Sequence, residues 1–90
     1  MSRYIKKLEG NKELAYGHDH AVGYFYDIFD NSPEIDNEHE AHVEGADSLF
    51  GYSKGPNAGK PFNRGQMAEV LIEYQADINH VYAVALDLTF

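Results

Sequence analysis

The most informative segment of the chain reads Val22-Gly23-Tyr24-Phe25-Tyr26-Asp27-Ile28-Phe29. Side chains alternate between the two faces of a β-strand, and here both faces receive apolar groups: Val22, Tyr24, Tyr26 and Ile28 on one, Phe25 and Phe29 on the other. Aromatic and β-branched residues at this density favour a well-paired strand. We therefore place this segment in the middle of an antiparallel sheet.

The residues before this strand predict a hairpin. Residues 3–9 are followed by Gly10-Asn11, a pair that tolerates the positive φ angles of a tight turn, and then by residues 12–16. A short helix over residues 3–9 is the alternative, with Ser2 as its N-cap and Gly10 just past its end. We prefer the hairpin, which gives an N-terminal meander of about three strands.

Two later segments have the composition of surface loops. In residues 31–47 the apolar periodicity is lost among acidic residues, Asn, Ser and Pro33. Residues 53–62 contain the turn-forming sequence Gly55-Pro56-Asn57-Ala58-Gly59. We expect an acidic loop over the first segment and a Gly/Pro loop over the second.

The C-terminal quarter predicts helices. Asn63 is a suitable N-cap, Gln66 stands at the reciprocal capping-box position, and apolar residues follow at helical spacing: Met67, Val70, Leu71 and Tyr74. A second helix is expected to begin after Asp77 and to bury one stripe, formed by Ile78, Val81, Tyr82, Ala85 and Leu86. Apolar residues also alternate over 82–90, so an edge strand stays open for the last residues.

These elements predict an α+β fold, a small antiparallel sheet with one or two C-terminal helices packed on one face. Ninety residues, 43% of them apolar, suffice for one hydrophobic core, so residues 1–90 are expected to form a single domain. The chain has no cysteine and no apolar run of signal-peptide or membrane-spanning length. We expect a cytoplasmic protein with no membrane partner.

Charge is unevenly distributed along the chain, whose formal net charge is -8. Between residues 13 and 53 there is no Lys or Arg, whereas the acidic residues are Glu13, Asp19, Asp27, Asp30, Glu34, Asp36, Glu38, Glu40, Glu44 and Asp47. A negative field repels phosphate backbones and attracts basic protein surfaces. The predicted partner is therefore a protein with a basic surface, and direct nucleic-acid binding is disfavoured. The alternative is that the acids only keep a small protein soluble.

The predicted partner-binding residues lie in and beside the acidic loop: Asp27, Asp30, Glu34, Asp36, Glu38, Glu40, Glu44, Asp47 and Tyr52. Tyr52 would add a large, rigid contact area with a polar tip. Tyr16 is likewise expected to be exposed beside this loop. Four further tyrosines lie in the predicted strand and helices, and most of them are expected at the edge of the core: Tyr24, Tyr26, Tyr74 and Tyr82.

Four of the five histidines form two close pairs in the sequence: His18 with His20, and His39 with His42. Imidazoles near carboxylates are what a zinc or other transition-metal site requires. Each pair would share a face, the first on a strand and the second on a helical turn. A metal-binding protein that uses these four residues is thus an alternative hypothesis. Exposed polar histidines are the simpler interpretation, because no motif such as His-Glu-x-x-His is present.

No recognisable catalytic motif occurs in the sequence. The segment from Gly55 to Lys60 superficially resembles a P-loop, but only three residues separate its glycines, and Pro61 stands where a magnesium-binding Ser or Thr belongs. There is neither a cysteine nucleophile nor a Gly-x-Ser-x-Gly elbow. The leading hypothesis is a non-enzymatic binding protein without a cofactor.

Three segments resemble small uncharacterised acidic proteins of bacteria, phages and mobile elements: residues 10–17, residues 23–26 and residues 84–88. The resemblance transfers no activity, cofactor or functional residue. Small acidic proteins of phages and mobile elements include inhibitors of host defence, such as anti-CRISPR proteins and DNA mimics. The resemblance therefore implies an inhibitor that engages a basic surface of nucleic-acid-handling machinery. A housekeeping interaction domain, in which the acids only solvate the surface, is a further alternative.

Overall fold

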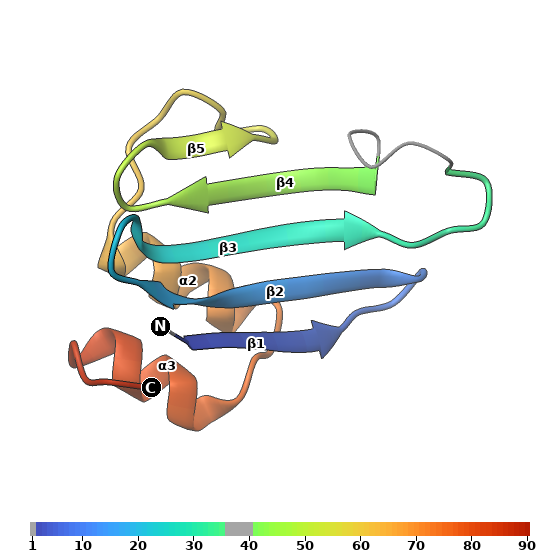
Figure 1. Ribbon diagram of the computed structural model, residues 1–90. Coiled ribbons are helices and arrows are strands. Elements are labelled where there is room, and N and C mark those ends of the chain that lie inside the picture. The colour runs from blue at the N-terminus through green and yellow to red at the C-terminus, as the bar shows by residue number, and fades with distance from the viewer. Residues whose placement is uncertain (1, 36–40) are drawn as a thin grey trace.

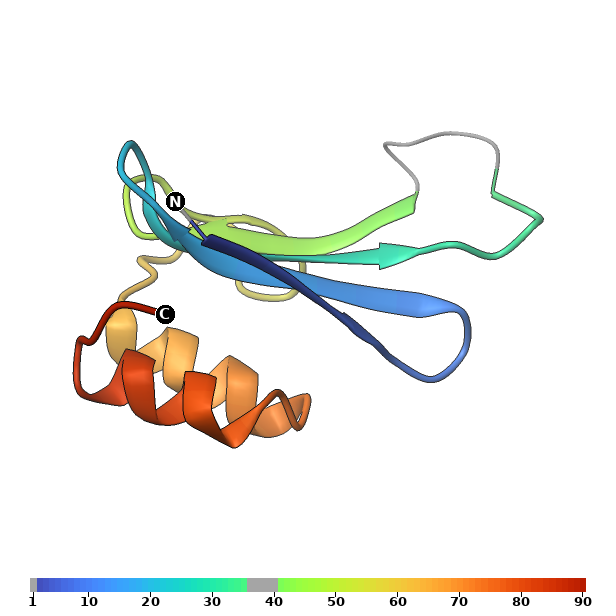
Figure 2. The ribbon, with the colours of Figure 1, turned by 60° about the horizontal axis from the view of Figure 1, so that its bottom comes forward.

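The computed structural model describes residues 2–35 and 41–90, which form one sheet and a layer of two helices (Figure 1). Five antiparallel strands are neighbours in chain order: β1 (Ser2–Lys7), β2 (Lys12–Asp19), β3 (Gly23–Asp30), β4 (His42–Asp47) and β5 (Gly51–Lys54). Both helices, α2 (Arg64–Glu73) and α3 (Ile78–Ala85), lie on one side of this sheet (Figure 2). The predicted α+β class is confirmed, with five strands in place of about three.

The first hairpin forms as predicted, so the helical alternative for residues 3–9 is wrong. Gly10 and Asn11 have φ angles of 72° and 63°, the left-handed conformation that a tight turn of this kind requires. The N–H of Leu8 donates a hydrogen bond of 2.8 Å to the carbonyl of Lys12 and closes the loop.

Strands β4 and β5 occupy parts of the two predicted loops, so both loops are shorter than expected. Residues 42–47 pair with β3, and residues 51–54 pair with β4. Register shifts interrupt both ladders, between Ile28 and Phe29 and between Gly45 and Ala46. A bulge breaks the alternation by which a strand is recognised, and β4 also has few apolar residues. Its pairing with β3 was therefore hidden in the sequence.

The core lies between the helices and one face of the two central strands. Its strand side comprises Leu14, Tyr16, Tyr26 and Ile28, and its helix side includes Met67, Leu71, Val81 and Val84. Tyr16 is only 3% exposed and bonds through its hydroxyl to His80 Nδ1, so the expectation that it lies on the surface is wrong. Residues at alternate positions of paired strands share a face, which is why these side chains meet.

Helix α2 begins as the sequence predicts. The Asn63 side chain accepts a hydrogen bond from the N–H of Gln66, and the Gln66 side chain accepts one from the N–H of Asn63. Asp77 likewise caps α3 through the N–H of Asn79. Within the residues that the structure describes, no helix is long and apolar enough to cross a membrane.

Helix α3 does not bury the predicted stripe. Val81, Ala83 and Val84 are buried, whereas Ile78 and Tyr82 are more than half exposed. The helix is apolar around most of its circumference, so the sequence alone does not distinguish its inner face from its outer face. Tyr82 therefore lies on the surface. The expectation that it lies at the edge of the core is wrong.

After α3 the chain does not form the edge strand that was kept open for residues 82–90. Leu86 is the C-cap, and Asp87, with a φ angle of 56°, ends the helix. The Tyr24 hydroxyl donates a hydrogen bond of 2.6 Å to Asp87 Oδ1. The ring of Phe90 stacks near those of Tyr4 and Tyr24, at centroid distances of 5.6 and 6.4 Å.

We expect Asn63→Ala to lower the free energy of unfolding by about 1 kcal/mol, because the first turn of α2 loses its capping hydrogen bond. Urea unfolding followed by circular dichroism measures the change. Asn57→Ala, the same replacement at an exposed loop position, should alter stability by less than about 0.5 kcal/mol. Equal unfolding midpoints for the two variants would show that the cap is not stabilising.

Candidate functional site

The face of the sheet opposite the helices, called here the open face, is covered by no described helix or strand (Figure 2). Directly paired residues place their side chains on the same face. One row across the open face therefore consists of Arg3, Gly17, Phe25 and Asp47, and the next of Ile5, Ala15, Asp27 and Gly45. Phe25 and Asp27 stand on the central strand β3, Phe25 between Gly17 and Asp47 and Asp27 between Ala15 and Gly45.

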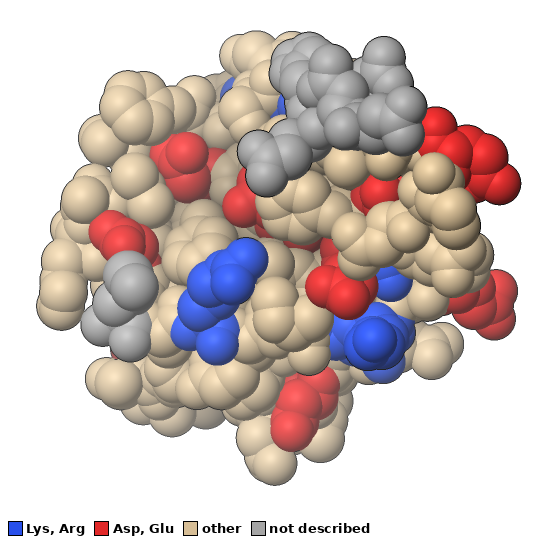
Figure 3. All heavy atoms as spheres, turned by 45° about the vertical axis from the view of Figure 1, so that its right-hand side comes forward, with Lys and Arg blue, Asp and Glu red and all other residues tan. Residues whose placement is uncertain are grey.

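The charges of the open face are mixed. Figure 3 looks obliquely onto this face and shows acidic side chains spread across it with basic ones between them. Pairing of β1 with β2 brings Arg3 beside Gly17 and Lys7 beside Glu13. Lys7 Nζ lies 4.0 Å from Glu13 Oε1. The base-free segment of the sequence is thus partly neutralised in space by the basic N-terminal strand.

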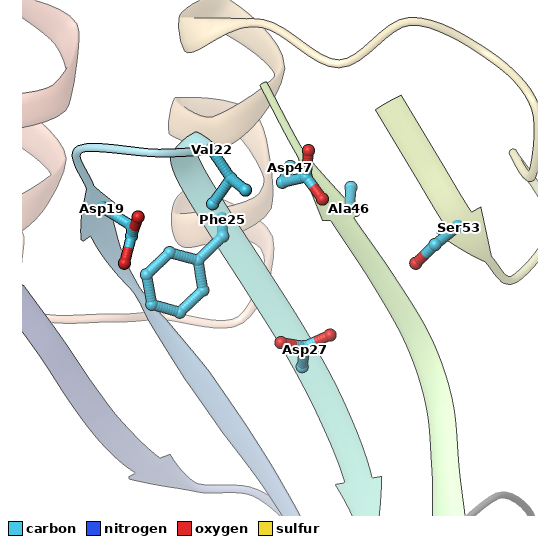
Figure 4. Close-up of a pocket in the computed structure, with 7 residues that line it drawn as sticks. All are labelled: Asp19, Val22, Phe25, Asp27, Ala46, Asp47 and Ser53. Carbon is cyan, nitrogen blue, oxygen red and sulfur yellow. The ribbon is translucent and has the colours of Figure 1, made fainter. Parts of the chain in front are cut away.

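A depression of about 250 Å³ lies on the open face and is lined by Asp19, Val22, Phe25, Asp27, Ala46, Asp47 and Ser53. Figure 4 shows the Phe25 ring between Asp19 and Asp27, with Asp47 and Ser53 on the neighbouring strands. Val22 lies in the turn before β3 and not on the core face, where alternation had placed it. The depression therefore combines three carboxylates with an aromatic ring.

Asp27 is hydrogen-bonded to His42 on the open face. Asp27 Oδ1 lies 2.9 Å from His42 Nε2, and the His42 ring also stacks 5.2 Å from that of Phe29. A Cβ atom on Gly45 would overlap both the Asp27 carboxylate and the His42 ring, so glycine at this position leaves room for the pair. His42 accordingly belongs to β4 and not to the acidic loop in which the sequence placed it.

Burial has the largest effect on the Asp27 carboxyl and raises its pKa above the ordinary value. The hydrogen bond and charge of His42 act in the opposite direction, as does the charge of Arg3, and Asp47 adds to the increase. The fold thus holds a carboxylate at a position where ionisation is unfavourable. Carboxylates of this kind are enriched at functional sites.

The other two carboxylates of the depression hold turns in place. Asp19 Oδ1 accepts a hydrogen bond of 2.7 Å from the N–H of Ala21. Asp47 Oδ1 accepts from the N–H groups of Leu49 and Phe50, at 3.0 and 2.6 Å. Local hydrogen bonds of this type fix an Asp side chain and the turn that follows it. Both carboxylates are therefore oriented before any partner arrives.

The turn capped by Asp47 exposes two large apolar side chains. Leu49 is 60% exposed and Phe50 is 77% exposed. The N–H of Leu49 also donates to the carbonyl of Val22, at 3.1 Å, which joins this turn to the rim of the depression. The sequence showed only a short apolar pair here. Its place within turn-forming residues was the signal that it would stay on the surface.

The predicted partner-binding residues are divided between different parts of the molecule. Asp27 and Asp47 lie on the open face, as described. Glu44 extends to the helix side, where its Oε2 accepts a hydrogen bond of 2.6 Å from the Tyr26 hydroxyl. Burial and this hydrogen bond raise the pKa of Tyr26. Glu44 therefore supports the core edge and does not contribute to the open face.

Tyr52 is half-buried, with its ring edge-on to those of Tyr26 and Phe62 at centroid distances of 6.4 and 5.2 Å. Tyr52 is therefore less exposed than a surface anchor would be. Asp30 ends β3, and its Oδ1 accepts hydrogen bonds from the backbone and hydroxyl of Ser32. Glu34 follows in the exposed loop. Three further predicted residues lie outside the described part of the chain: Asp36, Glu38 and Glu40.

The predicted histidine site is not assembled from the residues that the structure describes. His18 lies on the helix side of the sheet, with its ring 5.0 Å from that of Tyr24, and His20 lies in the following turn. His42 is on the open face, and His39 lies outside the described residues. Within residues 2–35 and 41–90, no group of three or more His, Asp or Glu side chains is placed to hold a metal ion.

No protein-family model, curated protein or solved structure matches this chain.

Titration of Asp27 gives a test of the site. The pKa of Asp27 is raised in the folded protein above its ordinary value of 3.8, so the folded protein binds this proton more tightly than the unfolded chain does. The contribution of Asp27 to stability therefore falls as the pH rises from 3.8 through the folded-state pKa. Asp27→Asn does not ionise. We therefore expect the free energy of unfolding of Asp27→Asn, relative to that of the wild type, to increase from about pH 3 to about pH 7. The increase should be less than about 1 kcal/mol, because solvent screens a partly exposed side chain.

Asp30→Asn is the matched control, since hydrogen bonds from Ser32 lower the pKa of Asp30. Its stability relative to the wild type should fall over the same pH range, the opposite sign. Urea unfolding at the two pH values measures both variants. Parallel pH dependence in the two variants would contradict the environment assigned to Asp27.

Proposed function

We propose that this chain is a non-catalytic binding protein whose open face engages a basic surface of a partner protein. The observation that carries the proposal is the depression around Phe25, with carboxylates on its rim and the exposed pair Leu49-Phe50 beside it. Protein interfaces typically place a few apolar anchors within a polar or charged rim. The open face has this composition.

The environment of Asp27 supports a binding role. Burial raises its pKa, so the isolated fold gains little from this ionised carboxylate. A Lys or Arg of a partner placed in the depression would supply an opposite charge, in a site shielded from water where a charge pair is stronger than on an open surface. Asp19 and Asp47, already oriented by their turns, would add to the attraction without loss of side-chain freedom.

The net charge of -8 favours a particular class of partner. Lys and Arg side chains gather on protein surfaces that bind the phosphate backbone of nucleic acids. A negative protein is steered toward such a surface by the same field that steers nucleic acid. We therefore propose a nucleic-acid-handling protein as the partner, which this chain would inhibit by covering its basic surface.

The triple variant Asp19→Asn, Asp27→Asn, Asp47→Asn tests the charged part of the interface. Asn retains the capping of both turns, so the fold should persist while three negative charges are lost. The partner is captured from an extract of the cells that carry the protein, and its binding is measured by interferometry from about 50 to about 500 mM salt. We expect about tenfold weaker binding at low salt, mainly through slower association.

The matched control removes three negative charges from the helix layer through Glu69→Gln, Glu73→Gln and Asp77→Asn, all exposed positions. Its affinity should stay within about twofold of the wild type. An equal loss for both triple variants would assign the effect to net charge alone, and unchanged binding by the first variant would contradict the proposed face. Double-stranded DNA added as a competitor should release the partner. If it does not, this chain does not bind the nucleic-acid-binding surface of the partner.

Phe50→Ala tests the apolar part of the interface. We expect faster dissociation and about tenfold weaker binding, since an exposed aromatic anchor would lose its contact area. The change should depend little on salt. Ile72→Ala, at a similarly exposed apolar position on α2, should leave the dissociation rate unchanged. Equal effects of the two substitutions would remove Phe50 from the interface.

A further inference from the structure

The outer side of α3 carries a row of large apolar side chains on the surface. Ile78, Tyr82 and Leu86 are 59%, 61% and 65% exposed. They follow one another at intervals of four residues, so they form a single ridge on the helix. Ala85 is exposed beside them. The inner side of the helix already packs on the core through Val81 and Val84, so the ridge is not needed to hold α3 in place.

The ridge is comparable in size to the largest apolar patch on a typical monomeric protein. At these exposed fractions its three side chains present about 400 Å² of accessible surface, within the range of the largest apolar patches on monomeric proteins and about half of what one partner contributes to a standard interface. Leu88, 56% exposed just after the helix, extends the apolar area. A ridge of this area suffices for the centre of an interface.

The ridge is also free of charge. No Asp, Glu, Lys or Arg occurs from Ile78 to Leu86, although nearly a quarter of the chain is charged. The acidic depression lies on the open face, whereas both helices cover the other face of the sheet (Figure 2). Two copies that met through their helix layers would keep the two acidic depressions on opposite outer sides of the dimer.

The order of the residues in the ridge favours a second copy of this chain as the occupant. Ile78 and Leu86 each stand four residues from Tyr82, so the ridge has apolar groups at equal distances on both sides of a central aromatic ring. A twofold contact requires a surface that is complementary to itself when one helix is reversed against the other. In that arrangement the two Tyr82 rings meet at the axis, and Ile78 of each copy faces Leu86 of the other.

We infer that the protein forms a twofold-symmetric dimer through antiparallel packing of the outer ridges of α3, centred on Tyr82. The dimer does not depend on the proposed function of the open face. It would direct two open faces away from each other and give the assembly two binding sites. Each open face would then hold its own partner molecule.

The first test measures mass by light scattering and sedimentation at about 5 to about 500 µM protein, a range that covers micromolar to submillimolar dissociation constants. We expect the wild type to approach twice the monomer mass of 10.2 kDa as concentration rises. Tyr82→Lys should remain at the monomer mass, because it places two like charges at the axis. Leu49→Lys, with the same exposure in the turn after β4, should dimerise as the wild type does.

Circular dichroism establishes that each variant is folded before its mass is compared, and Ile78→Lys replaces Tyr82→Lys if the latter unfolds. Because the chain has no cysteine, Tyr82→Cys provides a second test under mild oxidation by diamide. We expect a disulfide-linked dimer from Tyr82→Cys and none from Leu49→Cys. A monomeric wild type at every concentration, a dimer that survives Tyr82→Lys, or equal cross-linking of the two cysteine variants would each overturn the inference.

Discussion

The structure depends on the pairing of β2 with β3, because this register places the apolar side chains of both strands on the same face. Leu14 pairs with Ile28, and Tyr16 with Tyr26, and all four side chains are buried against the helices. A slip of one residue would turn this set toward solvent. The same register places Phe25 and Asp27 on the open face, so the candidate site is a consequence of how the core is formed.

The features that could be read from the sequence are those that neighbouring residues determine. Gly10-Asn11 specified a hairpin through its backbone conformation, and Asn63 and Asp77 specified helix starts through their side-chain hydrogen bonds. Strand β4 could not be read in this way, because its few apolar residues do not alternate regularly and its bulged ladder depends on pairing with another strand, β3. The outer face of α3 was hidden for a related reason, since an apolar helix can pack by any side.

The candidate site was only partly predictable, because sequence distance is a poor guide to distance between charges. The basic N-terminal segment returns to the open face through β1, and the charge of Arg3 lowers the pKa of Asp27 against the effect of burial. Glu44 and Asp47 are close in sequence, yet one extends toward the Tyr26 hydroxyl and the other caps a turn on the open face. Composition identified the sign of the charge, whereas strand register determined which acids act together.

The two layers of the molecule present surfaces of different physical character, and the two contacts that we propose therefore respond differently to salt. The open face carries carboxylates, so the association that we propose through it would be driven by Coulomb attraction and would weaken as salt screens the charges. The ridge of α3 carries no charge, so the dimer contact that we infer there would depend on apolar burial, which salt leaves unchanged or strengthens. Moderate salt would therefore release a partner from the open face while the helix layers of two copies stay together. A chain this small has room for one core. Because helices cover a single side of the sheet, the open face stays available for the charged contact and the outer side of α3 for the apolar one.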